Sequence, residues 1–151
     1  MARMMPDVTI RPLAADDRAA WGALWQGYLE FYGAARAPAI FDLTFARNLD
    51  PTRPQQQCLV AQKDGALVGL VHFIYHAHNW SDEDVCYLQD LYADPAARGL
   101  GIGRALIEAV YLAADTAGCP NVYWLTQEFN YTGRMLYDRV GTKTPFIKYS
   151  R

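Results

Sequence analysis

DPAARGLGIGRALIE, residues 94–108, places three glycines at alternate positions directly before a run with helical spacing. Glycine weakens a helix by roughly 0.5–1 kcal/mol per residue relative to alanine, so the three glycines need a compensating role. A strand followed by a glycine-rich turn and a helix start forms an anion site, because unpaired backbone N–H groups and the positive end of the helix dipole point to one place. The stretch therefore predicts a loop that binds an anionic ligand.

The spacing of the loop residues narrows the kind of anion. Arg98 and Arg104 flank the glycines, where they can pair with phosphates. A dinucleotide-binding fingerprint would need glycine at the position of Arg104, and the Gly-Lys-Ser/Thr ending of a P-loop is absent. The remaining pattern is Arg98-x-x-Gly101-x-Gly103 at a helix start. The alternative interpretation is a tight turn that binds nothing.

Strand-like and helix-like patterns lie on both sides of the loop. The run 85–93 is continuously apolar, which predicts a central strand, and apolar spacing predicts a helix from 102 to near Gly118. The Asp-Gly pair at 64–65 predicts a hairpin turn. Other expected strands cover 8–13, 58–62, 66–77, 121–126 and 145–150, and other expected helices cover 16–33, 40–49 and 132–140. This order predicts a single α/β (α+β) domain over 1–151.

Composition excludes several classes of function. With 151 residues, of which 52% are hydrophobic and 20% charged, the chain fits a folded globular protein. The formal net charge of -2 argues against a nucleic-acid partner, and no apolar run approaches the ~20 residues that span a bilayer. Three scattered cysteines without a C-x-x-C pair indicate a reducing compartment. We therefore expect a cytoplasmic protein without nucleic-acid or membrane partners.

Three histidines at even positions, His72, His76 and His78, would share one face of a strand, which raises the question of a metal site. At ~3.3 Å per residue, His72 and His78 are ~20 Å apart, too far to share one ion. His76 and His78 alone would supply two ligands, which make a poor site. The sequence predicts no metal.

Two signatures resemble the GNAT N-acetyltransferase superfamily. The loop spacing and the stretch LQDLYADPAARGLGIGRALI, residues 88–107, resemble its strand–loop–helix core. Asn130, Leu136, Tyr137 and Gly141 resemble its second signature, while Gly133 departs from the alanine usual in the family. Thr142 departs likewise from an aromatic residue often found after Gly141. The stretches 28–33 and 122–141 resemble the yeast histone/polyamine and D-amino-acid acetyltransferase group.

This resemblance implies a fold, a co-substrate and a set of binding residues. The implied fold is a twisted, mixed and mostly antiparallel sheet of six to seven strands flanked by about four helices. The implied co-substrate is acetyl-CoA, with no metal, and a homodimer is implied, formed through the segment 144–150. The residues that the resemblance assigns to acetyl-CoA are Leu91, Tyr92, Ala93, Arg98, Gly99, Leu100, Gly101, Ile102, Gly103, Arg104, Asn130 and Tyr137.

Acetyl transfer needs a neutral amine, a stabilised oxyanion and a proton for the departing thiolate. Tyr137 is the candidate proton donor, because a phenol with a pKa of ~10 stays protonated near neutrality and a thiolate has a pKa of ~8.5. The alternative for Tyr137 is a core tyrosine, and the alternative for Asn130 is a helix N-cap. In the family, backbone N–H groups of the strand before the loop polarise the thioester carbonyl.

The base and the substrate pocket are less specified by sequence. Asp90 and Glu128 are the carboxylates that lie on or just after strands leading to the expected cleft. Each could accept the amine proton or only attract the cation, and Glu128 could be a solvated surface residue. Tyr28, Tyr32 and Trp124 are the candidate substrate residues, since aromatic faces stabilise ammonium groups by ~0.5–2 kcal/mol. Trp21 and Trp25 read as core residues of the first helix.

The combined interpretation is an acetyl-CoA-dependent N-acetyltransferase that acts on a primary amine of a small substrate, either a polyamine or an amino acid. A second interpretation is acetylation of protein lysines or N-termini, which needs an open groove. A third is a module that binds acyl-CoA without turnover. The retained Asn130 and Tyr137 favour an enzyme.

Overall fold

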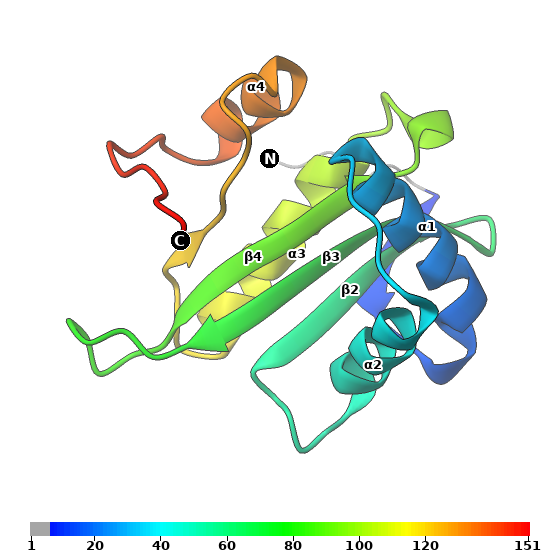
Figure 1. The fold of residues 1–151 in the computed structure, drawn as a ribbon, viewed down its shortest axis with the longest axis horizontal. Helices are drawn as coiled ribbons and strands as arrows, with labels where there is room; N and C mark the ends of the chain where they lie inside the picture. Colours follow the sequence, from blue (N-terminus) through cyan, green and yellow to red (C-terminus); the bar gives the residue numbers. More distant parts are fainter. Residues whose placement is uncertain (1–6) are drawn as a thin grey trace.

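The computed structural model describes residues 7–151, and Figure 1 shows one sheet with helices on both of its faces. The chain forms a first strand and two helices, then a hairpin and the central strand, and finally a long helix, a short strand and a last helix. In chain order the elements are β1 (Val8–Pro12), η1 (Ala15–Asp17), α1 (Arg18–Phe31), α2 (Pro38–Leu49), β2 (Gln56–Lys63), β3 (Ala66–His76), β4 (Val85–Ala93), η2 (Pro95–Ala97), α3 (Ile102–Thr116), β5 (Val122–Tyr123) and α4 (Tyr131–Val140).

The sheet is mixed and mostly antiparallel. Its strands lie in the order β1-β2-β3-β4-β5, and only the pair β4–β5 is parallel. The hairpin between β2 and β3 turns at Asp64 and Gly65, whose φ angles are 51° and 79°. Two successive positive φ angles are typical of the type I′ turn, which matches the twist of a hairpin. The predicted Asp-Gly turn is confirmed.

Two apolar clusters pack on the opposite faces of the sheet. Helices α1 and α2 cover one face, where Trp21 is 0% exposed and its ring stacks on Trp25 with centroids 5.3 Å apart. Helix α3 covers the other face with the buried side chains of Leu106, Ile107 and Val110. The interpretation of Trp21 and Trp25 as core residues is confirmed, as is the helix after the glycine loop.

The number of strands differs from the expectation, although the fold class is confirmed. The structure has five strands rather than six to seven in its described residues. The expected strand 121–126 is reduced to two residues, and the expected strand 145–150 does not form. A strand needs a neighbouring ladder for its N–H and C=O groups, and β5 is too short to supply one within the chain.

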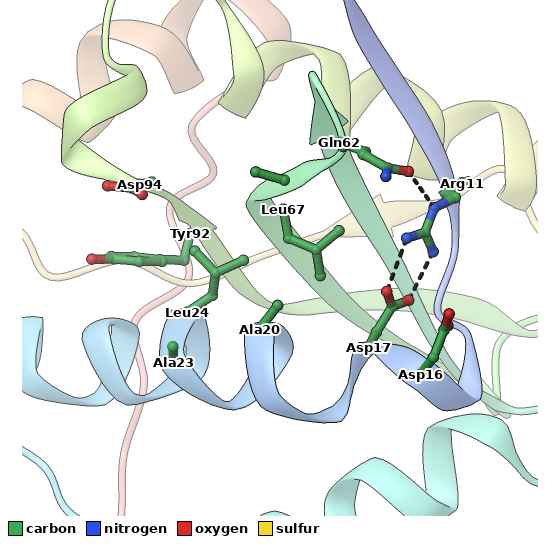
Figure 2. A pocket seen from close by; sticks show the side chains of 12 residues that line it. Arg11, Asp16, Asp17, Ala20, Ala23, Leu24, Gln62, Leu67, Tyr92 and Asp94 are labelled. Atoms are coloured by element: carbon green, nitrogen blue, oxygen red, sulfur yellow. Dashed lines mark hydrogen bonds and ion pairs between the residues drawn. The ribbon is translucent and has the colours of Figure 1, made fainter.

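An ion pair holds the N-terminal end of α1 against the edge strand β1. Arg11 on β1 donates from Nη1 and Nη2 to the two carboxylate oxygens of Asp17 at 2.7 and 2.9 Å, as Figure 2 shows. The same carboxylate accepts the backbone N–H of Ala14 at 2.8 Å. The hydrogen bond from Arg11 lowers the pKa of Asp17, the Ala14 N–H adds to this effect, and burial opposes it.

Asp17→Asn is expected to lower the free energy of unfolding by on the order of 1–3 kcal/mol, because charge-assisted hydrogen bonds are lost. The pKa of Asp17 is lower in the folded than in the unfolded chain. The stabilisation is therefore present at neutral pH and is lost as the pH falls through the folded-state pKa. Urea unfolding at neutral and acidic pH measures both effects. The exposed neighbour Asp16→Asn is the matched control, and equal losses in the two variants would contradict the role of the pair.

Candidate active site

The sheet opens between β4 and β5. These strands pair only at Cys86 with Val122 and at Tyr87 with Tyr123, whereas β4 continues to Ala93. After β5 the chain diverges from β4 on its way to α4 (Figure 1). Within residues 7–151, the backbone of β4 beyond Tyr87 therefore has no strand partner on this side.

A bulge in β4 lies at this opening. His72 on β3 is opposite Asp90, but the next residue, Phe73, is opposite Leu88, so that Gln89 has no partner on β3. The extra residue bends the strand and redirects its side chains. Leu88 and Leu91 consequently both pack against the α3 side of the sheet, although three positions separate them.

A cleft at the opening brings together residues from five parts of the chain. Helix α1 supplies one wall, the bulged part of β4 supplies the floor, and the segment after β5 together with α3 and α4 supplies the rest. The lining residues are Tyr28, Tyr32, Leu88, Gln89, Leu91, Ile107, Trp124, Leu125 and Tyr137. The cleft thus collects all three candidate substrate residues, the candidate proton donor and one of the assigned β4 residues.

Tyr137 on α4 lies against Trp124, with ring centroids 5.6 Å apart and planes at 66°. Burial and then the neighbouring Tyr32 raise the pKa of Tyr137 to about 12, so its hydroxyl is protonated at neutral pH. Gly141 permits this arrangement, because a Cβ there would lie 2.7 Å from the Trp124 ring. The glycine of the second signature is therefore explained by the close approach of a tryptophan.

Asn130 caps α4, which is the alternative that the sequence left open. Its Oδ1 accepts the backbone N–H of Gly133 at 3.2 Å, and its Nδ2 donates to Thr126 Oγ1 at 3.0 Å. A Cβ on residue 133 would lie 2.5 Å from Asn130 Nδ2, so an alanine there would require the Asn130 amide to shift.

The glycine loop presents backbone N–H groups at the start of α3. Gly99 and Gly101 have φ angles of 82° and 72°, which other residues rarely adopt. Gly101 is the N-cap residue, and no side chain of the described residues caps the N–H groups of this helix start. Gly103 lies beneath α4, since a Cβ there would be 3.3 Å from Leu136 Cδ2. The loop is therefore shaped to leave its donors available for an anion.

The side chains around the loop divide between solvent and core. Arg98 and Arg104 are both exposed, and Arg104 also donates to Glu108 at 2.9 Å. Leu100 is half-buried, whereas Ile102 is buried in the cluster beneath α3. Ile102 can therefore contribute only its backbone to a ligand, while the arginines can contribute their charge.

The two candidate bases occupy different environments. Asp90 is 8% exposed, and its Oδ2 accepts hydrogen bonds from His72 Nδ1 at 2.8 Å and from Trp25 Nε1 at 3.3 Å. Burial, and then the charge and hydrogen bond of Asp90, raise the pKa of Tyr28. Glu128 is exposed and is not among the residues that line the cleft. Asp90 adjoins the cleft through Tyr28, and Glu128 is not brought to it.

Sequence reasoning missed two residues near the cleft. Gln89 lines the cleft only because of the bulge, and His72 reaches Asp90 only because of the register between β3 and β4. Strand alternation places His72 on one face of its strand, but no local pattern indicates which carboxylate lies opposite. These two contacts depend on strand pairing, which the sequence does not specify locally.

A larger cavity of about 530 Å³ lies between α1 and the sheet (Figure 2), and it shares no lining residue with the cleft. Two of its three acidic groups have partners in the chain: Asp17 binds Arg11, and Asp94 accepts the backbone N–H of Ala96 at 2.9 Å. The Tyr92 side chain lines this cavity and crosses α1 at Gly27, where a Cβ would meet its hydroxyl. The Tyr92 ring therefore lines this cavity and not the cleft between β4 and β5.

Over residues 7–151, no group of three or more His, Cys, Asp and Glu side chains is arranged to hold a metal ion. In the same residues no helix has the length and apolarity needed to cross a membrane.

Comparison with known proteins finds a family match and related sequences. The model of the acetyltransferase (GNAT) family matches residues 21–142. The D-amino-acid N-acetyltransferase HPA3 of Saccharomyces cerevisiae is 37% identical over 145 residues, covering 95% of this chain and 90% of that protein. The thialysine N-epsilon-acetyltransferase of Sus scrofa is 32% identical over 62% of this chain and 49% of its own length.

Solved structures share the fold at low sequence identity. The aminoglycoside N-acetyltransferase AAC(6')-Iy in complex with CoA has a TM-score of 0.83 at 17% identity, with 100% of this chain and 98% of that chain covered. A ribosomal-protein-alanine N-acetyltransferase from Brucella melitensis has a TM-score of 0.80 at 23% identity, with 95% and 98% covered. From the family match and the almost complete alignment with the yeast relative, it follows that this chain belongs to the GNAT family of acetyltransferases.

Proposed function

We propose that this protein is a single-domain enzyme that transfers the acetyl group of acetyl-CoA to a primary amine of a small substrate, an amino acid or a polyamine. The observation that carries the proposal is the cleft at the β4–β5 opening, where Tyr28, Tyr32, Trp124 and Tyr137 meet beside the bulge. In the proposed reaction both substrates are bound together and the amine attacks directly. The buried, free cysteines accord with a reducing cytoplasm as the place of the reaction.

The glycine loop suits the diphosphate of acetyl-CoA. Its left-handed glycines and uncapped N–H groups offer several donors to one anion, and exposed Arg98 and Arg104 can pair with phosphates at its rim. Asn130 is proposed to contact the pantetheine arm while it caps α4. Bound there, acetyl-CoA supplies the thioester carbon that the amine attacks.

Backbone N–H groups within Leu91 to Ala93 are the proposed donors to the arm and to the thioester carbonyl. Strand alternation gives the open side the N–H groups of Leu91 and Ala93, because the N–H of Asp94 bonds to Val68 on β3 and that of Tyr92 points the same way. They are proposed because β4 has no neighbouring strand beyond Tyr87 on the side of β5. Donors that are fixed before the reaction stabilise developing negative charge without reorganisation, an effect commonly worth several kcal/mol. A polar backbone at the cleft floor thus has a catalytic use.

Tyr137 is proposed to donate a proton to the leaving thiolate. Its pKa of about 12 keeps the proton in place at neutral pH but makes complete transfer to a thiolate of pKa ~8.5 uphill. Tyr137 therefore stabilises the developing charge as a hydrogen-bond donor, and the proton that it passes to the sulfur as the thiol leaves is replaced by the second proton that the acceptor nitrogen loses as the amide forms.

Asp90 is the proposed final acceptor of the amine proton, with Tyr28 between them. The ammonium N–H bond breaks as an O–H bond forms on Tyr28, and the original Tyr28 proton moves to the Asp90 carboxylate. The Asp90 charge is close enough to raise the pKa of Tyr28, and the Tyr28 hydroxyl, which donates to the Gln89 carbonyl at 3.5 Å, has to turn from that carbonyl to pass its proton to Asp90. Glu128 is exposed outside the cleft, so a role for it would be limited to attracting a cationic substrate.

An amino acid is the favoured acceptor, because two relatives are named for acetylating a D-amino acid and thialysine. The narrow aromatic cleft favours a small amine over a protein lysine or N-terminus. A module that binds acyl-CoA without turnover would have no use for a protonated Tyr137 beside the opening.

A homodimer is proposed through the C-terminal segment. Phe146, Ile147 and Tyr149 are 84%, 76% and 88% exposed, and the short β5 leaves the outer edge of the sheet uncovered within the described chain. Exposed apolar side chains beside an uncovered sheet edge favour pairing with a second copy.

We expect CoA thiol to be released from acetyl-CoA in the presence of small amines. The panel contains polyamines, D- and L-amino acids and a lysine-rich peptide, and a thiol reagent measures release. Release with the peptide alone would support a protein acetyltransferase instead. No release with any amine, while calorimetry still detects acetyl-CoA binding, would support the binding module.

Tyr137→Phe is expected to lower kcat on the order of a hundredfold, because one donor to the developing thiolate is lost. The KM for acetyl-CoA should change little, since the ring is kept. Tyr131→Phe makes the same change at an exposed position of the same helix and is the matched control. Unchanged turnover in the Tyr137 variant would remove this tyrosine from the mechanism.

Light scattering on a gel-filtration column is expected to give a mass of about twice 17.0 kDa. Replacing Phe146 and Ile147 by aspartate should convert the dimer to a monomer, because charges would enter an apolar interface. Leu112→Asp, at a residue 69% exposed on α3, controls for added surface charge. A monomeric wild-type protein would refute the proposed dimer.

A further inference from the structure

A buried chain of polar side chains lies under α1, behind the cleft. Trp21 Nε1 donates to His72 Nε2 at 3.0 Å, and His72 Nδ1 contacts Asp90 Oδ2 at 2.8 Å. Trp25 Nε1 donates to the same oxygen at 3.3 Å. Trp21, His72 and Asp90 are 0%, 4% and 8% exposed. Four polar groups in an apolar cluster are costly to bury unless their hydrogen bonds are satisfied.

The indole of Trp21 determines which nitrogen of His72 carries the proton. An indole N–H can only donate, so Nε2 must accept and cannot hold a proton in this arrangement. The proton is then on Nδ1, which donates it to Asp90. His72 is therefore a neutral imidazole, and the Asp90 carboxylate keeps its full negative charge.

The surrounding groups would otherwise favour a charged imidazole. Burial lowers the pKa of His72, but Cys58 on β2 and Asp90 on β4 outweigh burial and raise it to about 10, so these groups alone would protonate the imidazole at neutral pH. Tyr28 on α1, Tyr32 directly after α1 and Tyr87 on β4 also face the Asp90 charge. Protonation of Nε2 would place an N–H against the Trp21 N–H, so the tryptophan opposes the pull of the carboxylate.

Arg18 does not neutralise this carboxylate. Its guanidinium lies over the Trp21 ring at 5.5 Å and pairs with Asp42 at 2.8 Å. The cation is thus separated from Asp90 by the indole layer and has a carboxylate of its own. The only formal charge in the buried chain is the one on Asp90.

We propose that Trp21 and His72 are positioning residues that hold Asp90 as an unneutralised carboxylate behind Tyr28, ready to take the proton of the acceptor ammonium. The inference rests on the proposed function and assigns roles to two residues of the core cluster. The neutral His72 orients the carboxylate through one hydrogen bond at Oδ2. An imidazolium in its place would pair with the carboxylate and make it a poorer proton acceptor.

The protonation state of His72 can be measured directly on the wild-type protein. Long-range ¹H–¹⁵N correlation at neutral pH is expected to show one protonated and one unprotonated ring nitrogen, Nδ1 and Nε2. The loss of these signals in His72→Asn assigns them. Two protonated nitrogens in the wild-type spectrum would overturn the inference, whatever the activity of the enzyme.

A pair of substitutions tests the consequence for the reaction. His72→Leu removes the donor to Asp90 and is expected to lower kcat/KM roughly tenfold to a hundredfold, the range for losing a hydrogen bond to a charged group. The acidic limb of its pH profile should move to higher pH, because an anion without its donor takes up a proton more readily. His72→Asn keeps an N–H donor and should recover most of the rate and the original limb.

A core variant separates positioning from packing. Phe45→Leu disturbs the same cluster, since the Phe45 ring lies 5.2 Å from the Trp21 ring, but it removes no polar group. It should lower the melting temperature without moving the pH profile. If His72→Leu behaves like Phe45→Leu in its pH profile, the inference is wrong while the proposed function stands. A wild-type protein that acetylates no amine would instead overturn the proposed function.

Discussion

The divergence of β4 from β5 after Tyr87 is the constraint on which the rest of the molecule depends. Two residue pairs hold the strands together, and beyond them β4 runs on without its neighbour. Unpaired backbone groups at a sheet edge need other partners, and a bound ligand can provide them. The bulge at Gln89 lies in this unpaired stretch and turns its side chains towards the opening.

Helices α3 and α4 stabilise the open arrangement. Ile102, Leu106 and Val110 anchor α3 in the core, so that the N–H groups of its first turn face outward in a fixed position. Helix α4 has no buried residue and is held by a few specific contacts instead. The Tyr111 hydroxyl on α3 donates to the Val140 carbonyl on α4 at 2.7 Å, and Gly141 lets the Trp124 ring pack closely.

Most of the fold could be predicted from the sequence, because residue patterns within single elements specify them. The Asp-Gly turn, the continuous apolar run 85–93 and the spacing after Gly101 each act within one element, and each prediction is confirmed. The last strand failed because the apolar run PFIKYS satisfies a local pattern while its ladder partner is missing from the described chain. A segment becomes a strand only when it pairs with a neighbouring segment, so counting single apolar segments overestimates the number of strands in the sheet.

The candidate site likewise combines residues that sequence patterns predict with residues that they do not predict. Glycines that need positive φ and a tyrosine in a signature can be found by position, and Tyr28, Tyr32, Trp124 and Tyr137 do meet in one cleft. The register that sets His72 against Asp90 involves residues 18 positions apart. The contact of Trp21 with His72 spans 51 positions. Neither of these two contacts is indicated by a local sequence pattern, and the bulge that shifts the register between β3 and β4 involves a single residue, Gln89.

Two tyrosines on opposite walls of the cleft differ in what lies behind them. Burial raises the pKa of both, so both hydroxyls are neutral. Tyr28 has the Asp90 carboxylate behind it, which can take a proton that the hydroxyl passes on. Tyr137 has Trp124 and apolar surroundings, with no carboxylate among the groups that shift its pKa. The proposed direction of proton flow, in at Tyr28 and out at Tyr137, thus follows from where the fold buries one negative charge.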